Sequence, residues 1–345
     1  MEKRKERIIV SEEKSKNRVL LIDALNMFIR SYVINPTLDP KGIPIGGAVG
    51  FMKSLQKVCR QLRPHEVVIC WDGIGGSQRR KAQDKNYKAG RKPLRFNRRM
   101  FELDPVAQEQ NKIYQLIRLH EYLNELPIIQ ISLDGIEADD VIAYLATHEK
   151  YKEWQRVIIS SDKDFYQLCD SRTVVYRPIQ DEVITKGLLT MKEGIHPTNY
   201  ALARAVVGDK SDNLPGIKQV GMKTVAKFFS FLEESKQYEV EDLITHCNSL
   251  EKLSKAHLNI VEGKELIQKN YNMMQLYSPL ISYLNKQSID YHIGESEPEF
   301  NKTNLFKMLL SDGQASLKLD SLYAVMRKIM KEKKNLSICL TETTV

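Results

Sequence analysis

Short apolar runs, separated by longer stretches of mixed polarity, recur along the first half of the chain. They are "RVLLID" (18–23), "EVVICWD" (66–72), "IIQISLD" (128–134), "RVIISSD" (156–162) and "TVVYRP" (173–178). Continuous apolar runs of this length are typical of strands that are buried on both faces, and the intervals leave room for crossover helices. The pattern predicts an α/β fold whose central, mostly parallel sheet carries helices on both faces.

Four of these runs end in aspartate. The four residues are Asp23, Asp72, Asp134 and Asp162. One aspartate at the end of a strand is usually a turn former or a helix cap. In open parallel sheets, however, ligands bind beyond the carboxyl ends of the strands, so the repetition predicts an acidic pocket at that edge.

The segment "GIEADDVIAYLA" (135–146) adds carboxylates to this pocket. Helical spacing predicts an apolar face made of Ala138, Val141, Ile142 and Leu145. The first turn of that helix then holds Glu137, Asp139 and Asp140. The helix dipole stabilises a negative charge there by about 0.3–1 kcal/mol, which accounts for one acidic residue and leaves the others unexplained.

Two more pairs of carboxylates lie downstream, in "SSDKDFYQL" (160–168) and "GDKSDNLPGIKQVGMKT" (208–224). The full set of candidate metal ligands is Asp23, Asp72, Glu137, Asp139, Asp140, Asp162, Asp164, Asp209 and Asp212. Carboxylates that converge in a partly desolvated pocket repel one another unless cations bind. Because the set contains neither Cys nor His, it predicts Mg²⁺, for which Mn²⁺ can substitute, and its size suits two or more ions.

The positive charge of the chain is concentrated in one segment. The whole sequence has a formal net charge of +8, whereas residues 78–99, "QRRKAQDKNYKAGRKPLRFNRR", hold ten Lys or Arg and one Asp, a net charge of +9. A solvated, disordered linker is one interpretation. Ten cations in so short a stretch repel one another unless a polyanion compensates, so we favour nucleic acid as the partner.

Other features narrow the class of protein. The five cysteines are scattered and the seven histidines do not cluster, which argues against a disulfide framework, a zinc site or a histidine-based triad. The start of the chain is charged where a signal peptide needs an apolar segment, and no apolar run is long enough to span a membrane. We therefore expect a cytoplasmic protein with no membrane partner.

Several of these motifs resemble, in the same order, those of the 5′ nuclease superfamily. They are "LLIDALN", "PIGGAVGFMKSL", "WDG", "YKAGRK", "GIEADDVIA", "SSDKDFYQL" and "GDKSDNLPGIKQVGMKT". This superfamily comprises flap endonucleases and the 5′-3′ exonuclease domain of bacterial DNA polymerase I, with free-standing phage versions. The resemblance extends from about residue 18 to residue 232 and implies a PIN-like 5′ nuclease fold with a helical arch and a helix-three-turn-helix motif.

The resemblance also assigns roles to single positions. It implies a first metal cluster of Asp72, Glu137, Asp139 and Asp140, with Asp23 bound through water. It implies a second cluster of Asp162, Asp164, Asp209 and Asp212. Lys88 and Arg91 take the catalytic positions that contact the scissile phosphate, and Tyr87 takes a position that can stack on a base.

Contacts with DNA are implied on both sides of this centre. In the arch, at about residues 73–110, they are Arg79, Arg80, Lys81, Lys85 and Tyr87. In the helix-three-turn-helix, at about residues 199–232, they are Gly216, Lys218, Gly221, Lys223, Thr224 and Lys227. Backbone N–H groups of the 216–221 hairpin can hold a phosphate, and in the family its carbonyls can bind K⁺.

The expected organisation is a charged leader (1–17), a nuclease core (18–198) and a helical region (199–345). The expected function is that of a monomeric, structure-specific 5′ nuclease in replication or repair, acting beside other replication proteins. It would hydrolyse DNA with 5′ flaps, nicks or 5′ ends, and RNA/DNA hybrids, by two-metal-ion catalysis. A PIN-type ribonuclease and a non-catalytic DNA junction-binding protein stay open as alternatives.

Overall fold

The computed structural model describes residues 17–89, 104–295 and 298–342, and within them six strands form one sheet. The strands are β1 (Arg18–Asp23), β2 (Glu66–Asp72), β3 (Ile129–Leu133), β4 (Gln155–Ile159), β5 (Thr173–Arg177) and β6 (Glu182–Ile184). Their order across the sheet is β3-β2-β1-β4-β5-β6, and β6 alone among these pairs antiparallel to its neighbour. The predicted α/β fold with a mostly parallel sheet is confirmed.

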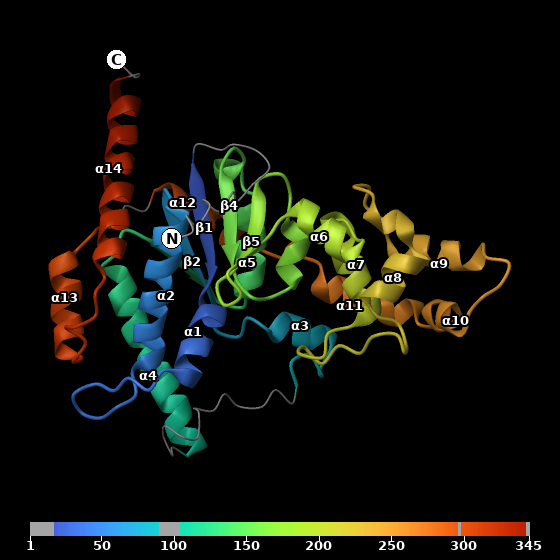
Figure 1. Ribbon diagram of the computed structural model, residues 1–345, viewed down its shortest axis with the longest axis horizontal. Helices are drawn as coiled ribbons and strands as arrows, with labels where there is room; N and C mark the ends of the chain where they lie inside the picture. The colour runs from blue at the N-terminus through green and yellow to red at the C-terminus, as the bar shows by residue number, and fades with distance from the viewer. Residues whose placement is uncertain (1–16, 90–103, 296–297, 343–345) are drawn as a thin grey trace, which may run out of the picture.

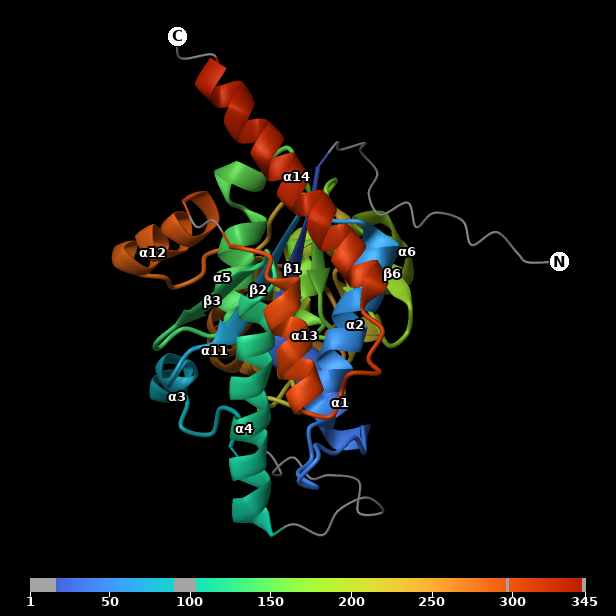
Figure 2. The same cartoon turned by 90° about the vertical axis from the view of Figure 1, so that its left-hand side faces the viewer.

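Strand β1 occupies the middle of the sheet and separates two hydrophobic cores. Successive side chains of a strand point to opposite faces, so Val19 and Leu21 join one core while Leu20 and Ile22 join the other. Both faces are covered by helices, as Figures 1 and 2 show. This arrangement explains why β1 reads as a continuous apolar run and not as an alternating one.

The core that contains Leu20 is closed by helices from both ends of the chain. They are α1 (Ala24–Ile34), α2 (Gly46–Leu62), α4 (Pro105–Asn124), α13 (Lys302–Ser311) and α14 (Asp320–Glu342). In Figure 2, α13 and α14 lie beside α4 and α2. The C-terminal helices therefore brace the side of the sheet opposite α5.

The core that contains Val19 continues into the second half of the chain. Its helices are α5 (Ala138–Ala146), α6 (Lys186–Glu193), α7 (Pro197–Val207), α8 (Met222–Phe228), α9 (Val240–Asn248), α10 (Lys255–Glu262), α11 (Lys264–Met274) and α12 (Tyr283–Gly294). Ile195 and Tyr200 both belong to this core, so the packing is continuous across the boundary expected at residue 198. Of the helices after that residue, α12 packs against β3, whereas α8 to α11 extend the core by packing on α7 and on one another (Figure 1).

Two expected features lie partly outside the described residues. These are the leader, of which residues 1–16 are outside, and the arch, of which residues 90–103 are outside. The described parts of the arch segment are α3 (Gln78–Gln83) and the start of α4, where Asp104 caps the helix by accepting the N–H groups of Val106 and Ala107. None of the helices in the described ranges is long and apolar enough to cross a membrane.

Candidate active site

Three neighbouring strands each bring a carboxylate to one edge of the sheet. Asp23 is the last residue of β1, Asp72 is the last residue of β2, and Asp162 follows β4. Because β1 lies between β2 and β4, this edge is the switch point of the topology, where open α/β sheets bind ligands. The structure thus brings these three predicted residues together.

Helix α5 directs its first turn at the same edge. Asp72 accepts the N–H of Ala138 at 2.8 Å, so a neighbouring strand supplies the cap and the side chain of Glu137, at the N-cap position, makes no capping bond. Asp139 then faces Asp162 and Asp23. Burial, followed by the charges of these two residues, raises the pKa of Asp139 well above its ordinary value.

We call Asp23, Asp72, Asp139 and Asp162 the central carboxylates. Asp23 accepts hydrogen bonds from the N–H of Asn26 at 3.1 Å and from Ser160 Oγ at 3.0 Å. Even so, burial and the charges of Asp72 and Asp162 raise the pKa of Asp23 to about 7. Burial also raises the pKa of Asp162, and the charges of Asp212 and Asp209 add to this effect. The centre therefore favours a cation.

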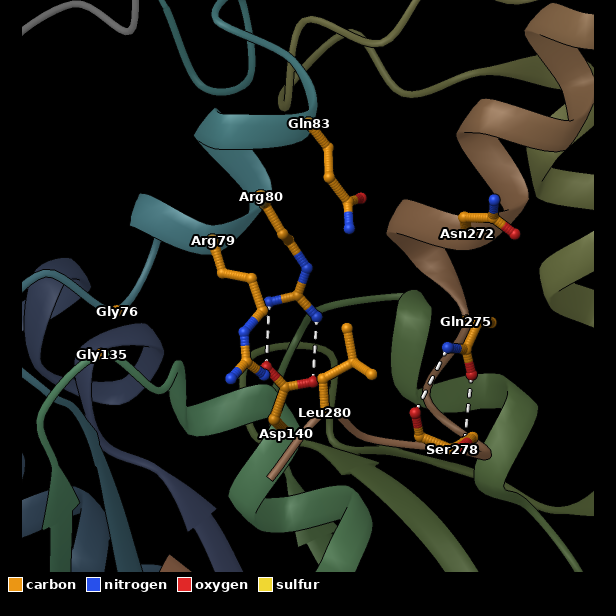
Figure 3. A pocket seen from close by; sticks show the side chains of 10 residues that line it. All are labelled: Gly76, Arg79, Arg80, Gln83, Gly135, Asp140, Asn272, Gln275, Ser278 and Leu280. Carbon is orange, nitrogen blue, oxygen red and sulfur yellow. Dashed lines mark hydrogen bonds and ion pairs between the residues drawn. The ribbon is translucent and has the colours of Figure 1, made fainter. Parts of the chain in front are cut away.

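Glu137 and Asp140, which we call the first acidic group, are paired with cations from the segment 78–88. Arg80 donates to both oxygens of Asp140, at 3.1 and 3.2 Å (Figure 3). It also donates to Glu137 Oε2. Lys88 Nζ lies 2.5 Å from Glu137 Oε1. Although Glu137 is buried, the charges of Arg80 and Lys88 lower its pKa.

Asp164 and Asp209, which we call the second acidic group, share one arginine. Arg204, on α7, donates to Asp164 Oδ1 at 3.1 Å through Nη2 and also bonds to Asp209 Oδ2. Burial and the charge of Asp162 raise the pKa of Asp164 to about 7, whereas hydrogen bonds from Ser211 and the charge of Arg204 lower that of Asp209 despite its burial. The sequence had not singled out Arg204.

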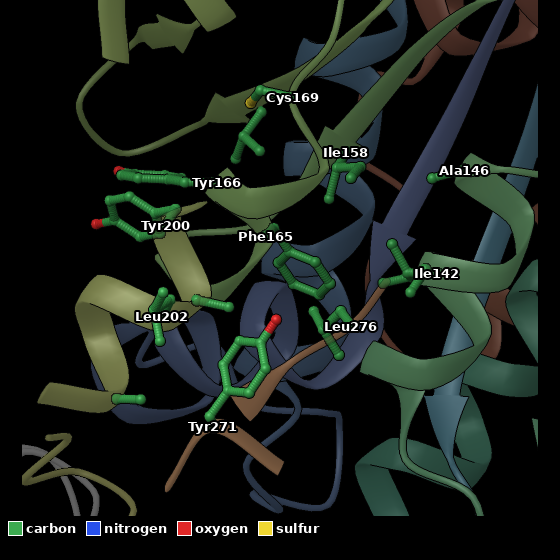
Figure 4. Packing of buried hydrophobic residues seen from close by; sticks show 14 of the residues in the cluster. Ile142, Ala146, Ile158, Phe165, Tyr166, Cys169, Tyr200, Leu202, Tyr271 and Leu276 are labelled. Atoms are coloured by element: carbon green, nitrogen blue, oxygen red, sulfur yellow. The ribbon is translucent and has the colours of Figure 1, made fainter. Parts of the chain in front are cut away.

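Packing fixes the position of Asp164. It opens a short 3-10 segment, Asp164–Leu168, in which Phe165 is buried. Figure 4 shows Phe165 among Ile142, Tyr271 and Leu276, side chains from α5, from α11 and from the chain just after it. The second acidic group is therefore held by the core of the protein.

The carboxylate oxygens suit a divalent metal ion in their chemistry, but some of them already accept bonds from protein cations. Oxygen-only carboxylates with raised pKa values favour a hard cation such as Mg²⁺. Across the described ranges, however, no three or more His, Cys, Asp or Glu side chains are arranged to hold a metal ion. Arg80, Lys88 and Arg204 occupy oxygens of both acidic groups, whereas none of the three bonds to a central carboxylate in the interactions described.

The predicted catalytic pair is split by the limits of the described chain. Lys88 has a positive φ of 55°, which is uncommon for a residue with a side chain, and its N–H donates to the carbonyl of Asp212 at 2.9 Å. This bond ties Lys88 to the loop after α7. Arg91 lies outside the described residues.

Two of the predicted DNA contacts lie in the acidic centre instead. The side chain of Arg80 is only 13% exposed and is fully engaged by protein groups. Tyr87 is 3% exposed, and its hydroxyl donates to Glu137 at 3.3 Å, so it does not present a face to stack on a base. By contrast, Arg79, Lys81 and Lys85 are exposed.

The connection between α7 and α8 forms a tight hairpin. The N–H groups of Asp209 and Leu214 each donate to the other residue's carbonyl at 2.8 Å. A Cβ on Gly216 would lie 1.8 Å from the carbonyl oxygen of Val207, so only glycine fits there. Gly221 has open space around it. The lysines expected at DNA, Lys218, Lys223 and Lys227, are exposed, and Thr224 is half-buried.

The sheet topology, the acidic edge and the hairpin between two helices define the class of 5′ nuclease folds, as the sequence predicted. The chain belongs to the 5′-3′ exonuclease family: the family described as "5'-3' exonuclease, N-terminal resolvase-like domain" matches residues 18–194.

Curated relatives agree with this assignment. The chain is 29% identical to a 5′-3′ exonuclease of Aquifex aeolicus over 92% of its own length and 98% of the relative. It is 29% identical to a flap endonuclease Xni of Shewanella baltica over 82% of its length and 97% of the relative. It is also 33% identical to a thermostable DNA polymerase I of Thermus thermophilus over 61% of its length, which is 24% of that polymerase.

Solved structures show the same fold. A bacteriophage T5 flap endonuclease complex with DNA and metal ions has a TM-score of 0.61 at 14% identity and covers 85% of this chain and 99% of its own. A T5 5′-exonuclease with bound zinc has a TM-score of 0.62 at 16% identity, with the same coverage. At such identities the likeness concerns the fold alone.

Proposed function

We propose that the protein is a structure-specific 5′ nuclease that hydrolyses phosphodiester bonds of DNA with divalent cations at the central carboxylates. The observation that carries the proposal is the convergence of Asp23, Asp139 and Asp162 at the switch point, where burial and mutual repulsion raise their pKa values. A hydrolase needs such a site to face its substrate. The basic segment that begins at α3 starts beside it.

Mg²⁺ is the proposed ion, and Mn²⁺ can replace it. When bound, such ions supply an activated water and a Lewis acid for the leaving oxygen. The protein's part is to present the oxygens of Asp139 and Asp162 and to hold Asp23 through its bonds to Asn26 and Ser160. Lys88, on release from Glu137, can offset the charge that builds on the phosphoryl oxygens. The products would be a 5′ phosphate and a 3′ hydroxyl.

The proposed substrates are DNA duplexes with a 5′ flap, a nick or a free 5′ end, and RNA 5′ ends paired with DNA. The full-length match to relatives named 5′-3′ exonuclease and flap endonuclease supports this choice. Lys218, Lys223 and Lys227 are exposed and would contact duplex phosphates without reading sequence. Carbonyls of the hairpin would hold K⁺ when DNA binds.

The test uses a double-flap DNA labelled at its 5′ end, with Mg²⁺ or with EDTA. The purified protein is compared with Asp162→Asn and with Asp134→Asn, a matched control at a strand end that is exposed and is not among the nine candidate ligands. We expect Mg²⁺-dependent release of the flap near the junction by the unchanged protein and by Asp134→Asn, and none by Asp162→Asn.

Other results identify the alternatives. Binding of the flap in Mg²⁺ without cleavage would establish a junction-binding protein, in which Arg80, Lys88 and Arg204 permanently replace the ions. Faster cleavage of unstructured RNA than of the DNA flap would establish a PIN-type ribonuclease. Full turnover by Asp162→Asn would contradict the proposed site.

A further inference from the structure

The chain that follows α3 makes a turn that leads to Lys88. Asp84 is the C-cap of α3, and its carboxylate accepts the N–H of Asn86 at 2.8 Å. The N–H of Tyr87 donates to the carbonyl of Asp84 at 2.9 Å. Lys88 comes next, with a φ of 55°. A residue with a side chain keeps such a positive φ only where the surrounding structure imposes it.

The tip of the hairpin between α7 and α8 supplies that surrounding structure. Lys88 donates its N–H to the carbonyl of Asp212 at 2.9 Å. The side-chain amide of Asn213 donates through Nδ2 to the carbonyl of Asn86 at 3.0 Å. Asn213 itself has a φ of 60°, a left-handed conformation that asparagine tolerates better than most residues. Two left-handed residues therefore lie on either side of this contact, where the chain after α3 meets the hairpin (Figure 1).

A buried apolar contact accompanies these hydrogen bonds. Leu214, the residue after Asn213, is only 2% exposed and belongs to a small cluster with Tyr87 and with Met273 and Met274 of α11. Burial of apolar surface stabilises a contact without fixing its geometry, whereas hydrogen bonds are directional. The cluster therefore holds the turn against the hairpin, and the bond from Asn213 helps to set the exact path of its backbone.

The contact fixes the backbone of Lys88, and the side chain extends from it to the acidic centre. Its Nζ has one hydrogen bond among those described, to Glu137 Oε1 at 2.5 Å. Although burial opposes the charge of Lys88, the charges of Glu137 and Asp139 raise its pKa. The ammonium group is therefore close enough to Asp139, a central carboxylate, to interact with its charge. A shift of the backbone at Lys88 moves this group, and a misplacement of about 1 Å in a catalytic site can cost about 100-fold in rate.

We propose that Asn213 is a positioning residue that fixes the backbone of Lys88 through its bond to Asn86, and so places the lysine head group for the scissile phosphate. The inference rests on the proposed function, in which Lys88 offsets charge on the phosphoryl oxygens. The hairpin then has two roles. Lysines beyond its tip contact the duplex, and the tip itself sets the side chain that acts on the phosphate.

The first measurement is hydrogen–deuterium exchange of the full chain in EDTA without DNA, followed by mass spectrometry over residues 84–89. Asn213→Gly keeps the left-handed backbone and removes the amide. Gln219→Gly makes a similar change at another positive φ of the same hairpin, 62°, at an exposed residue, and is the matched control. We expect residues 84–89 to exchange about fivefold faster in Asn213→Gly, as the loss of one hydrogen bond predicts, and at an unchanged rate in Gln219→Gly.

The second measurement separates the rate of cleavage from the affinity for DNA. At saturating double-flap DNA with Mg²⁺, Asn213→Gly should cleave about fivefold more slowly than the unchanged protein. Its affinity for the flap in Ca²⁺ should not change, because the exposed lysines of the hairpin are intact. If Asn213 acts through Lys88, adding Asn213→Gly to Lys88→Ala should cause no further loss of rate. A general loosening of the fold would instead lower both rate and affinity.

The remaining outcomes are distinct. Unchanged exchange and rate in Asn213→Gly would overturn the inference, as would a loss of rate that adds to that of Lys88→Ala, and a loss of affinity alone would make Asn213 a DNA contact. Faster exchange over residues 209–214 would mean that the hairpin itself has loosened. Asn213→Asp, which tolerates a left-handed φ but cannot donate to Asn86, then replaces Asn213→Gly in both measurements. If the unchanged protein did not cleave the flap, the proposed function would fail along with the inference, whereas cleavage with unaffected variants would remove the inference alone.

Discussion

The two acidic groups of the centre are neutralised from different parts of the fold. Asp164 and Asp209 share Arg204, which projects from α7 within the hydrophobic core. Their partner belongs to the same packed unit as the carboxylates. The second acidic group is therefore neutralised within the folded core.

The first acidic group is neutralised by residues of the basic segment that begins at α3. Arg80 and Lys88 lie at the start of the stretch 78–99, in which the net positive charge of the chain is concentrated. Any event that moves this stretch, such as binding of a polyanion, acts on Glu137 as well. The comparison teaches that similar acidic groups can differ in whether their charge balance responds to the substrate.

Loss of Arg204 is expected to have the largest effect. Arg204→Gln leaves Asp164 and Asp209 without their cation in a largely buried site, so the free energy of unfolding should fall by about 3–5 kcal/mol in EDTA at pH 7.5. Arg177→Gln, which breaks a more exposed pair with Glu182, should lose no more than about 1 kcal/mol. Urea unfolding measures both. Equal losses would mean that the second acidic group is not held by its arginine.

Loss of Asp139 tests the central carboxylates, which belong to neither acidic group. Asp139→Asn should reduce flap cleavage by about 100-fold, because its carboxylate lies closer to the proposed ion site than the orienting groups whose loss costs about 10–100-fold. Binding of the flap in Ca²⁺ should be retained, which gel shift can check beside Asp134→Asn. Unchanged cleavage would move the site away from the central carboxylates.

The pH dependence of stability sharpens the comparison further. The pKa of Asp23 is raised from 3.8 to about 7 in the folded state, chiefly by burial. Between these values the folded protein binds more protons than the unfolded chain, so the stability that this residue contributes falls as pH rises from about 4 to 7. Asp23→Asn keeps a helix-capping side chain and removes the charge.

In EDTA, Asp23→Asn should therefore match the unchanged protein near pH 4 and exceed its stability at pH 8 by about 1–3 kcal/mol, since each pKa unit corresponds to about 1.4 kcal/mol. Thermal melts across this range give the measurement. Added Mn²⁺ should stabilise the unchanged protein more than the variant. If the difference in stability between the two proteins did not vary with pH, the buried charge of Asp23 would not destabilise the fold.

Sequence patterns predicted most of this centre. Apolar runs located β1 to β5, helical spacing located α5, and the rule for strand ends brought Asp23, Asp72 and Asp162 to one edge. These features are local, or follow from topology that the order of elements determines. Strand β6 was missed because three residues cannot show an alternating pattern.

Pairings between distant charges were not predictable in the same way. Arg80 reaches Asp140 across 60 positions of sequence, and nothing in a run of ten cations distinguishes the one that turns inward. Tyr87, which was expected to stack on a base, is also buried, and nothing in the surrounding charged sequence indicates this. Arg204 left a clearer signal, because it is the one charged residue of the otherwise uncharged helix "PTNYALARAVV" and precedes Asp209 by five positions.

The exposed lysines of the hairpin and α8 should behave in the opposite way to the buried centre. Lys223 is exposed and does not contact the acidic groups in the interactions described, so Lys223→Gln should weaken binding of duplex DNA most at low salt. The slope of log affinity against log salt should fall by about 0.9, so the deficit of the variant should shrink by about threefold between 0.05 M and 0.2 M salt. Turnover at saturating DNA should not change. Lys152→Gln, an exposed lysine paired only with Glu149 among the interactions described, is the control. Because solvent screens each lysine separately, the losses of duplex affinity at Lys218, Lys223 and Lys227 should add. Fluorescence anisotropy at several salt concentrations gives the measurement, and non-additive losses among the lysines would indicate that they form one rigid phosphate site.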